Sequence, residues 1–526
     1  MPIDFLPLRE ENVFHDYPMM YWPNGRKIIA ASRIIARDDR LHAVYLGNFR
    51  CGPDSFLLHY VREEMNGKPY LQLEVDEHSA DAGMITRCEA FLDSLKGYIK
   101  VNKKREKAAK PVIIHHGSNE RTLYFPYMND SAHTLAAAAR GCGVKAEVLP
   151  MQDERDLELG RMYTSSRECF PMICTTGSFL KKMNEPGFNP SKASFFMPDH
   201  GGPCRFGQYR KLQRIIFDRL GYSDVEIISP SNENAYKDLS GGRSIKFRLG
   251  GWKAVVAADL LRKLHQERKP YEAEEGKTDR VYRHCLDQAV KSLERGWKDL
   301  AEVLAKAAAA FGEIRVVDGL RKPVVAIVGE IFMRDNPFCS GFLVQRLEEL
   351  GAETIIAPLR EWVAFSAYRY WRESIWKGDL MGLVKSRLME IVQDVTSRKL
   401  DKAISHVAEM NRNISVEEIL ELCNPYVHKH YDGDPPIALG AAAGLARTGI
   451  SGVANILPFT CLPGTFITSV ARVFRKDYEN IPWVDIAYDG QEDTGIETRL
   501  QAFMYQAKEF ARERGHDKPR NWTAGV

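Results

Sequence analysis

The chain has 526 residues, of which 44% are hydrophobic and 27% are charged. Lys plus Arg (73) nearly balance Asp plus Glu (70), so the formal charge of +3 gives no electrostatic basis for binding nucleic acid. The sequence has no apolar run of membrane-spanning length, and it does not begin like a signal peptide. We therefore expect a cytoplasmic protein that binds neither nucleic acid nor a membrane, with its ten cysteines reduced or bound to metal.

Residues 1–110 are expected to form a partial α/β unit. A short apolar run precedes Cys51, and Pro53 then marks the start of a helix. This pattern places the thiol between the carboxyl end of a strand and the amino end of a helix, where open α/β sheets bind ligands and anions are stabilised. A second apolar strand from Leu71 and an amphipathic helix from Asp81 complete the unit.

A regular alternation of strands and helices begins near Arg121 and predicts a doubly wound parallel sheet for residues 111–245. Two cysteines of this domain repeat the local design of Cys51. Cys169 lies in S-S-R-E-C-F-P and Cys204 in G-G-P-C-R-F-G-Q-Y, each at a strand or loop end that faces a helix start.

Residues 246–320 are rich in Ala, Leu, Lys and Glu and predict a helical insert. The alternation restarts near Pro323, so residues 321–526 are expected to form another α/β domain, interrupted by a helical insert at residues 361–411. Cys461 follows an apolar strand of this domain. The expected fold class is therefore α/β, with two or more doubly wound, Rossmann-like domains of parallel sheet, helical inserts and the N-terminal partial unit.

The N-terminal unit is repeated near the end of the sequence. The motif F-R-C-G-P-D-S-F around Cys51 matches F-T-C-L-P-G-T-F around Cys461. Farther on, D-A-G-M-I-T-R-C-E-A-F from Asp81 matches D-T-G-I-E-T-R-L-Q-A-F from Asp493. Two matching pieces in the same order predict a duplicated structural unit.

Four thiols with one local design favour a common metal site, made by Cys51, Cys169, Cys204 and Cys461. Four thiolates suit a [4Fe-4S] cluster, because soft iron takes cysteine ligands and backbone N–H groups at helix starts stabilise its negative charge. Cys174 or Cys339 would join a larger cluster. The alternative is that these cysteines are small buried hydrophobic residues, as we expect for Cys88, Cys142, Cys285 and Cys423.

Six motifs spread over nearly the whole chain carry a family resemblance. They are N-F-R-C-G-P-D-S-F, D-E-H-S-A-D-A-G, S-S-R-E-C-F-P, G-P-C-R-F-G-Q-Y, V-G-E-I-F-M-R-D-N-P-F and P-F-T-C-L-P-G-T-F. Together they resemble the 2-hydroxyacyl-CoA dehydratase superfamily, in the branch of the very large CoA-substrate-specific enzyme activases. The resemblance implies an iron-sulfur protein that accepts electrons energised by ATP hydrolysis and delivers them to a substrate at very low potential. It also implies ATPase modules upstream of the dehydratase-like part.

The sequence contains no P-loop and no paired phosphate-binding glycine segments, so we expect no ATPase site in this chain. We expect a separate ATPase or activase subunit to complete the partial N-terminal unit, with self-association as the alternative. The chain would then act as a low-potential reductase or dehydratase-like component. A non-enzymatic scaffold or assembly subunit, with structural cysteines or a structural cluster, is the alternative from another class. No catalytic acid or base is assigned.

Arginines flank three of the four cysteines: Arg50, Arg167 and Arg205. A guanidinium beside a reduced cluster would stabilise its added negative charge and raise its potential. The alternative is that these side chains face solvent.

Overall fold

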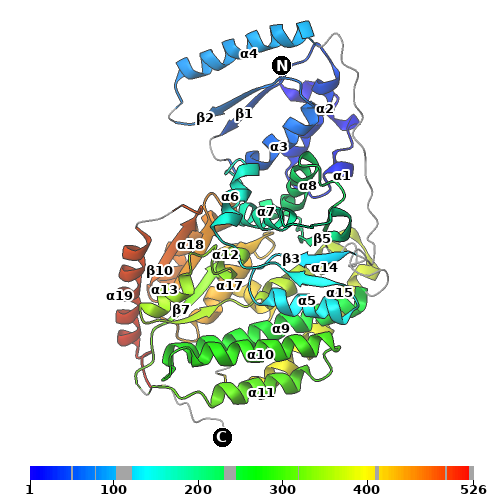
Figure 1. Ribbon diagram of the computed structural model, residues 1–526. Coiled ribbons are helices and arrows are strands. Elements are labelled where there is room, and N and C mark those ends of the chain that lie inside the picture. Colours follow the sequence, from blue (N-terminus) through cyan, green and yellow to red (C-terminus); the bar gives the residue numbers. More distant parts are fainter. Residues whose placement is uncertain are drawn as a thin grey trace.

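The computed structural model describes residues 1–48, 51–77, 79–101, 121–229, 244–317, 319–408, 414–491 and 495–519 (Figure 1). Its strands form three sheets, one of two strands and two of four, and every strand pair in them is parallel. Helices connect the strands and cover the sheets. The expected α/β class with parallel sheets is therefore confirmed.

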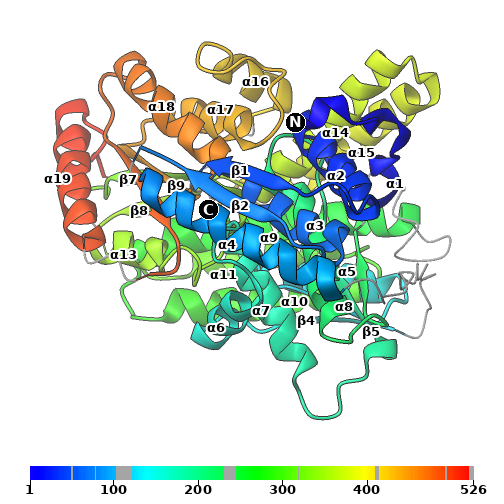
Figure 2. The ribbon, with the colours of Figure 1, turned by 90° about the horizontal axis from the view of Figure 1, so that it is seen from above.

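The N-terminal unit contains the two-stranded sheet. Its elements are α1 (Val13–Asp16), α2 (Pro23–Arg37), β1 (Val44–Asn48), α3 (Asp54–Met65), β2 (Leu71–Val75) and α4 (Asp81–Val101). Helix α3 and helix α4 lie on opposite faces of the strand pair (Figure 1). Figure 2 looks down on this unit and shows α4 and the two strands lying over the rest of the chain.

The middle sheet has the strand order β4-β3-β5-β6. Its elements are β3 (Thr122–Phe125), α5 (Ser131–Gly141), β4 (Ala146–Val148), α6 (Glu154–Tyr163), α7 (Phe170–Met183), β5 (Ala193–Phe196), α8 (Tyr209–Arg219) and β6 (Glu226–Ile228). Helices α6 and α7 pack closely because Gly160 and Gly177 lack side chains where the helices meet. A Cβ on Gly177 would lie only 1.7 Å from the carbonyl oxygen of Asp156.

A layer of helices lies below the two larger sheets. It consists of α9 (Ser244–Arg268), α10 (Lys277–Glu294) and α11 (Leu300–Gly312), against which α14 (Leu359–Lys377) and α15 (Leu380–Ile404) also pack. Their apolar side chains form one buried cluster that includes Leu260, Leu304, Phe311 and Ile404. This shared core makes the two helical segments a single layer.

The third sheet has the order β10-β9-β7-β8. Its elements are β7 (Val324–Gly329), α12 (Ile331–Asp335), α13 (Leu343–Glu349), β8 (Glu353–Ile356), α16 (Val416–Cys423), α17 (Asp434–Ala446), β9 (Gly452–Pro458), α18 (Leu462–Asp477), β10 (Trp483–Tyr488) and α19 (Ile496–Arg514). The central strands β7 and β9 are buried along their whole length. Both read as continuous apolar runs, as strands covered on both faces do.

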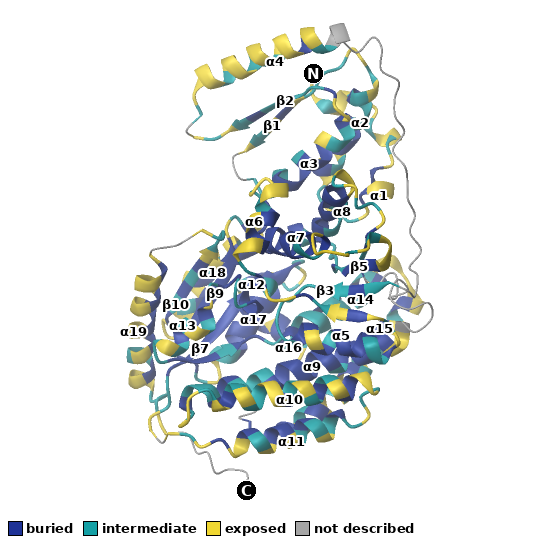
Figure 3. Cartoon of the chain, viewed as in Figure 1, coloured by how far each residue is buried: buried dark blue, intermediate teal, exposed yellow. Residues whose placement is uncertain are grey.

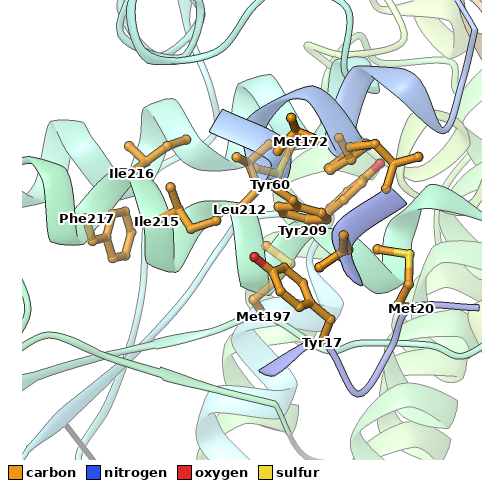
Figure 4. Close-up of a cluster of buried hydrophobic side chains, with 14 of the residues drawn as sticks. Tyr17, Met20, Tyr60, Met172, Met197, Tyr209, Leu212, Ile215, Ile216 and Phe217 are labelled. Atoms are coloured by element: carbon orange, nitrogen blue, oxygen red, sulfur yellow. The ribbon is translucent and has the colours of Figure 1, made fainter. Parts of the chain in front are cut away.

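The N-terminal helices and the middle domain share one hydrophobic core. Tyr17, Met20 and Tyr60 of the first unit pack among Met172 and Tyr209 of the middle domain (Figure 4). The unit is therefore anchored through α2 and α3, whereas α4 is exposed along most of its length (Figure 3).

The strand pair β1–β2 and the strand pair β9–β10 have the same register. Val44 pairs with Leu71, and Ala454 pairs with Val484. This register makes Leu46 the counterpart of Ile456, five residues before the cysteine in each copy. Among the described helices, none is both long and apolar enough to cross a membrane.

Candidate functional site

The four candidate cysteines lie at the starts of helices. Cys169 and Cys461 are the residues that cap the amino ends of α7 and α18, and Cys204 caps a short 3-10 helix, Arg205–Gln208. The Cys461 Sγ accepts a hydrogen bond from the Gly464 amide at 3.4 Å. Cys51 lies just before α3. Cys169 differs from the other three, because it follows the end of α6 rather than a strand.

Three of the four thiols lie close together. Burial raises the pKa of the Cys204 thiol, and negative charge on Asp434, Cys461 and Cys169 raises it further. Burial also raises the pKa of Cys461, and negative charge on Cys169 raises it further. These thiols cannot all ionise side by side unless a cation neutralises them.

Cys51 has a different environment. It is half buried, and burial raises its pKa, with nearby Asp54 raising it further and Arg205 lowering it. The Asp54 carboxylate also accepts a hydrogen bond from the Tyr45 hydroxyl at 2.6 Å. Arg205 therefore connects Cys51 with the other three cysteines.

Arg205 is the residue at which all four cysteine loops meet. Its buried guanidinium follows Cys204 directly and donates hydrogen bonds to the loops of the other three. The acceptors are the carbonyl oxygens of Gly52 (3.5 Å), Arg167 (3.2 Å) and Thr460 (3.1 Å), with the hydroxyls of Ser55 (3.0 Å) and Thr460 (3.3 Å). Gly52 follows Cys51, Arg167 lies two residues before Cys169, and Thr460 precedes Cys461.

The loop of Cys169 is further held by a buried hydrogen bond between side chains. Glu168 is buried and lies 2.5 Å from the Nε2 atom of His59 on α3. Its carboxylate also accepts hydrogen bonds from the Ser165 hydroxyl and from backbone amides, and these contacts lower its pKa although burial opposes them. Glu168 thus holds the loop of Cys169 against the first unit.

A cavity of about 370 Å³ is lined by Pro171, Phe206 and Glu330, among other residues. It lies at the carboxyl ends of β3, β5 and β7, which is where open α/β sheets bind ligands. Its walls are mainly apolar and include Trp362, and its polar groups include His200, Arg369 and Glu330. Tyr209 lines the cavity and also hydrogen-bonds to the Cys169 side chain, so this tyrosine links the cavity with the cysteine site.

Glu330 stands between the cavity and the cysteines. Burial raises its pKa to about 8, and the charge of Asp434 contributes to this shift. The negative charge of Glu330 in turn influences Cys169 and Cys461. At neutral pH Glu330 therefore carries a proton beside the site.

The remaining cysteines are distributed as follows. Cys174 and Cys339 are fully buried and their thiols form a hydrogen bond with each other. Cys142, Cys285 and Cys423 are buried elsewhere, and Cys88 is half buried on α4. Arg167 lies beside Glu74, with which it forms an ion pair. Arg50 lies outside the described residues.

Sequence reasoning missed Glu330 and Asp434. Glu330 directly follows the buried strand β7, so its place at the carboxyl end of a parallel strand was a readable signal. Asp434 begins α17 in the motif D-G-D-P-P, and its carboxylate accepts a hydrogen bond from the Trp362 indole at 3.1 Å. That contact joins helices far apart in the sequence, so only the fold reveals it.

Fold and site together define an α/β protein of parallel sheets with buried cysteines gathered beside an apolar cavity. Comparison of the chain with models of protein families and with curated proteins finds no match. Among the described residues there is also no group of three or more His, Cys, Asp or Glu side chains arranged to hold a single metal ion.

Proposed function

We propose that this chain is an iron-sulfur protein whose cluster is held by Cys51, Cys169, Cys204 and Cys461, and which passes low-potential electrons to a substrate. The observation that carries this proposal is the convergence of the four cysteine loops on Arg205. Residues from three separate parts of the sequence meet there. Buried thiols that serve only as hydrophobic residues do not require such an arrangement.

Four thiolates suit a [4Fe-4S] cluster, because soft iron takes cysteine ligands. The cysteine sulfurs around a cubane lie about 7 Å apart, farther than the ligands of one metal ion. Helix starts at Cys169 and Cys461 supply backbone N–H groups that stabilise negative charge. When bound, such a cluster supplies one-electron transfer at low potential.

The cavity is the proposed substrate site. A molecule with an apolar body would be held by its walls, and Glu330 would donate a proton to the substrate as it is reduced. Tyr209 fixes the Cys169 side of the cavity through its hydrogen bond. The family resemblance leaves open whether the substrate is a CoA thioester or another molecule.

The resemblance also supports a separate ATPase or activase subunit as the electron donor. We also propose a cytoplasmic setting, as expected from the sequence. Self-association is the alternative for the partner surface. We further infer that the units β1-α3-β2-α4 and β9-α18-β10-α19 are copies of one ancestral unit. Their common element order and strand register support this inference.

Iron analysis of single-cysteine variants tests the proposed cluster. After anaerobic purification or reconstitution, the wild-type chain should be brown, absorb broadly near ~400 nm and hold about four iron ions. Cys51→Ser, Cys169→Ser, Cys204→Ser and Cys461→Ser should each lose most of the iron. Cys285→Ser and Cys423→Ser are matched controls, because both residues are buried far from the site and should leave iron content unchanged.

Three other outcomes have clear meanings. Loss of iron in Cys174→Ser or Cys339→Ser would indicate the larger cluster. A brown wild-type protein whose iron is insensitive to the four substitutions would refute these ligands. A folded, colourless and iron-free wild-type chain would refute the cluster and favour the scaffold function.

A further inference from the structure

The outer part of the N-terminal sheet has an apolar surface facing solvent. Val44 and Leu46 on β1 are 52% and 70% exposed. Within the described residues β1 pairs with β2 alone, so its other edge presents unpaired backbone N–H and C=O groups. Proteins normally cover such an edge, because it is a template for pairing with another strand.

The counterpart residues in the C-terminal unit are completely buried. Ala454 and Ile456, which correspond to Val44 and Leu46, have exposed fractions of 0%. The same contrast holds on the covering helix. Leu92 on α4 is 57% exposed, whereas Met504, its counterpart on α19, is 1% exposed. The same apolar surface is therefore covered by other elements in the C-terminal unit and exposed to solvent in the N-terminal unit.

The C-terminal unit shows which elements cover this surface. The edge of β9 that corresponds to the free edge of β1 pairs in parallel with β7. Helix α13 follows β7, and its Leu343 and Leu347 join α19 in one core over Ala454 and Ile456. In the N-terminal unit α4 covers the buried residues Leu71 and Leu73 of β2, but no described element takes the place of β7 and α13.

We propose that a separate polypeptide completes the N-terminal unit by adding a parallel, apolar strand to the free edge of β1 and packing the following helix against Val44, Leu46 and Leu92. This is strand addition, in which main-chain hydrogen bonds supply affinity and alternate side chains supply specificity. The inference rests on the likeness of the two units and not on the proposed cluster.

The geometry favours another kind of chain over a second copy. A two-fold axis that joined two β1 edges would pair them antiparallel, whereas β7 lies parallel to β9. The strand would also end near Cys51, which follows β1 closely. The partner would therefore stand beside Cys51, which is half buried.

A peptide with the β7 sequence tests the edge directly. The probe is a synthetic peptide of residues 322–331 (K-P-V-V-A-I-V-G-E-I) with two added lysines for solubility, mixed with the full-length chain. Amide hydrogen exchange and the molar mass in solution are measured with and without the peptide. We expect a monomer in which the amides on the free edge of β1 exchange quickly, and at least about a tenfold slowing of their exchange when the peptide binds.

A charge in the surface should abolish this effect. In Leu46→Lys the peptide should no longer slow amide exchange in β1. In Leu388→Lys the peptide should still slow it, since Leu388 is a similarly exposed leucine on α15. Both positions face solvent, so neither substitution should unfold the chain, and circular dichroism checks this. Iron content is measured on the same samples, so failure of the cluster and failure of the docking surface are distinguishable.

Any of three results would overturn the proposal. A dimer with protected β1 amides that Leu46→Lys dissociates would identify a second copy as the occupant. A monomer with protected β1 amides would show that the chain covers this edge itself. Fast exchange that the peptide does not slow would show that the edge does not accept a parallel strand.

Discussion

Arg205 shows how one side chain can organise loops that are distant in sequence. Its fork of N–H donors reaches three loops at once, and the acceptors are neutral carbonyl and hydroxyl oxygens. The guanidinium charge therefore remains available to favour negative charge on the cysteines. Its position beside Cys204 could be read from the sequence, but its contacts depend on the whole fold.

The substitution Arg205→Lys separates charge from geometry. Lysine keeps the positive charge, but its single ammonium group cannot bridge three loops. We expect iron content to fall by more than half and the midpoint of thermal unfolding to fall by several degrees. Arg210→Lys is the control, because Arg210 is half exposed and forms an ion pair with Asp199 at 3.2 Å. Equal iron and equal stability in both variants would show that the loops hold their positions without Arg205.

Glu330 gives a prediction about pH. Its pKa rises from its ordinary value of 4.5 to about 8 in the folded chain, so folding takes up a proton between those values. The free energy of unfolding should therefore decrease as pH rises from about 4.5 to 8, by up to about 1.4 kcal/mol per pH unit from this group.

Urea unfolding of the iron-free chain at several pH values in this window measures the effect. Glu330→Gln should make the pH dependence shallower without abolishing it, because burial also raises the pKa of Glu361, to about 7. Glu349→Gln, on the exposed side of α13, should follow the wild-type curve. A Glu330→Gln curve that coincides with the wild type would show that Glu330 is ionised at neutral pH.

Among the elements, the strands that are buried on both faces were the easiest to predict from the sequence. The runs that became β7 and β9 were expected as strands because both faces are covered and the residues are apolar throughout. The packing of α6 on α7 could not be anticipated, since Gly160 and Gly177 matter only after the two helices meet.

Substitution of a glycine in this helix pair tests the packing. Gly177→Ala would push a methyl group into the backbone at Asp156, so we expect a loss of about 1–3 kcal/mol or more in unfolding free energy. Gly83→Ala on α4 is the matched control, because no atom lies within 4 Å of the added methyl group. That control should be neutral or more stable by up to about 1 kcal/mol. Urea denaturation distinguishes them, and equal stabilities would mean that α6 can shift freely on α7.

At the scale of the whole molecule, the expected boundary near residue 110 lies outside the described residues. The core crosses it nevertheless. Phe56 stacks on Tyr209 with ring centroids 6.0 Å apart, and the Tyr60 hydroxyl donates to the Gln208 carbonyl at 3.3 Å. Composition and periodicity locate strands and helices, but they do not reveal which faces of two neighbouring units fuse.

This shared core predicts cooperative unfolding of the first unit with the middle domain. Phe56→Ala should cost about 3–5 kcal/mol and reduce amide protection in α2, α3 and α8 together. Phe474→Ala, in the C-terminal core, should reduce protection around α17 and α18 instead. Hydrogen exchange resolved by peptide measures both. Loss of protection confined to α2 and α3 would show that residues 1–110 unfold independently.

The order of the four cysteines along the chain has a consequence for biosynthesis. Cys51, Cys169 and Cys204 leave the ribosome first. Cys461 lies between β9 and α18 and leaves it much later. At roughly 5–20 residues per second, translation would leave three thiols waiting on the order of tens of seconds for the fourth. If these four are the ligands, the complete ligand set exists only after Cys461 has been synthesised, and an oxidant met during that interval would find the first three thiols unprotected.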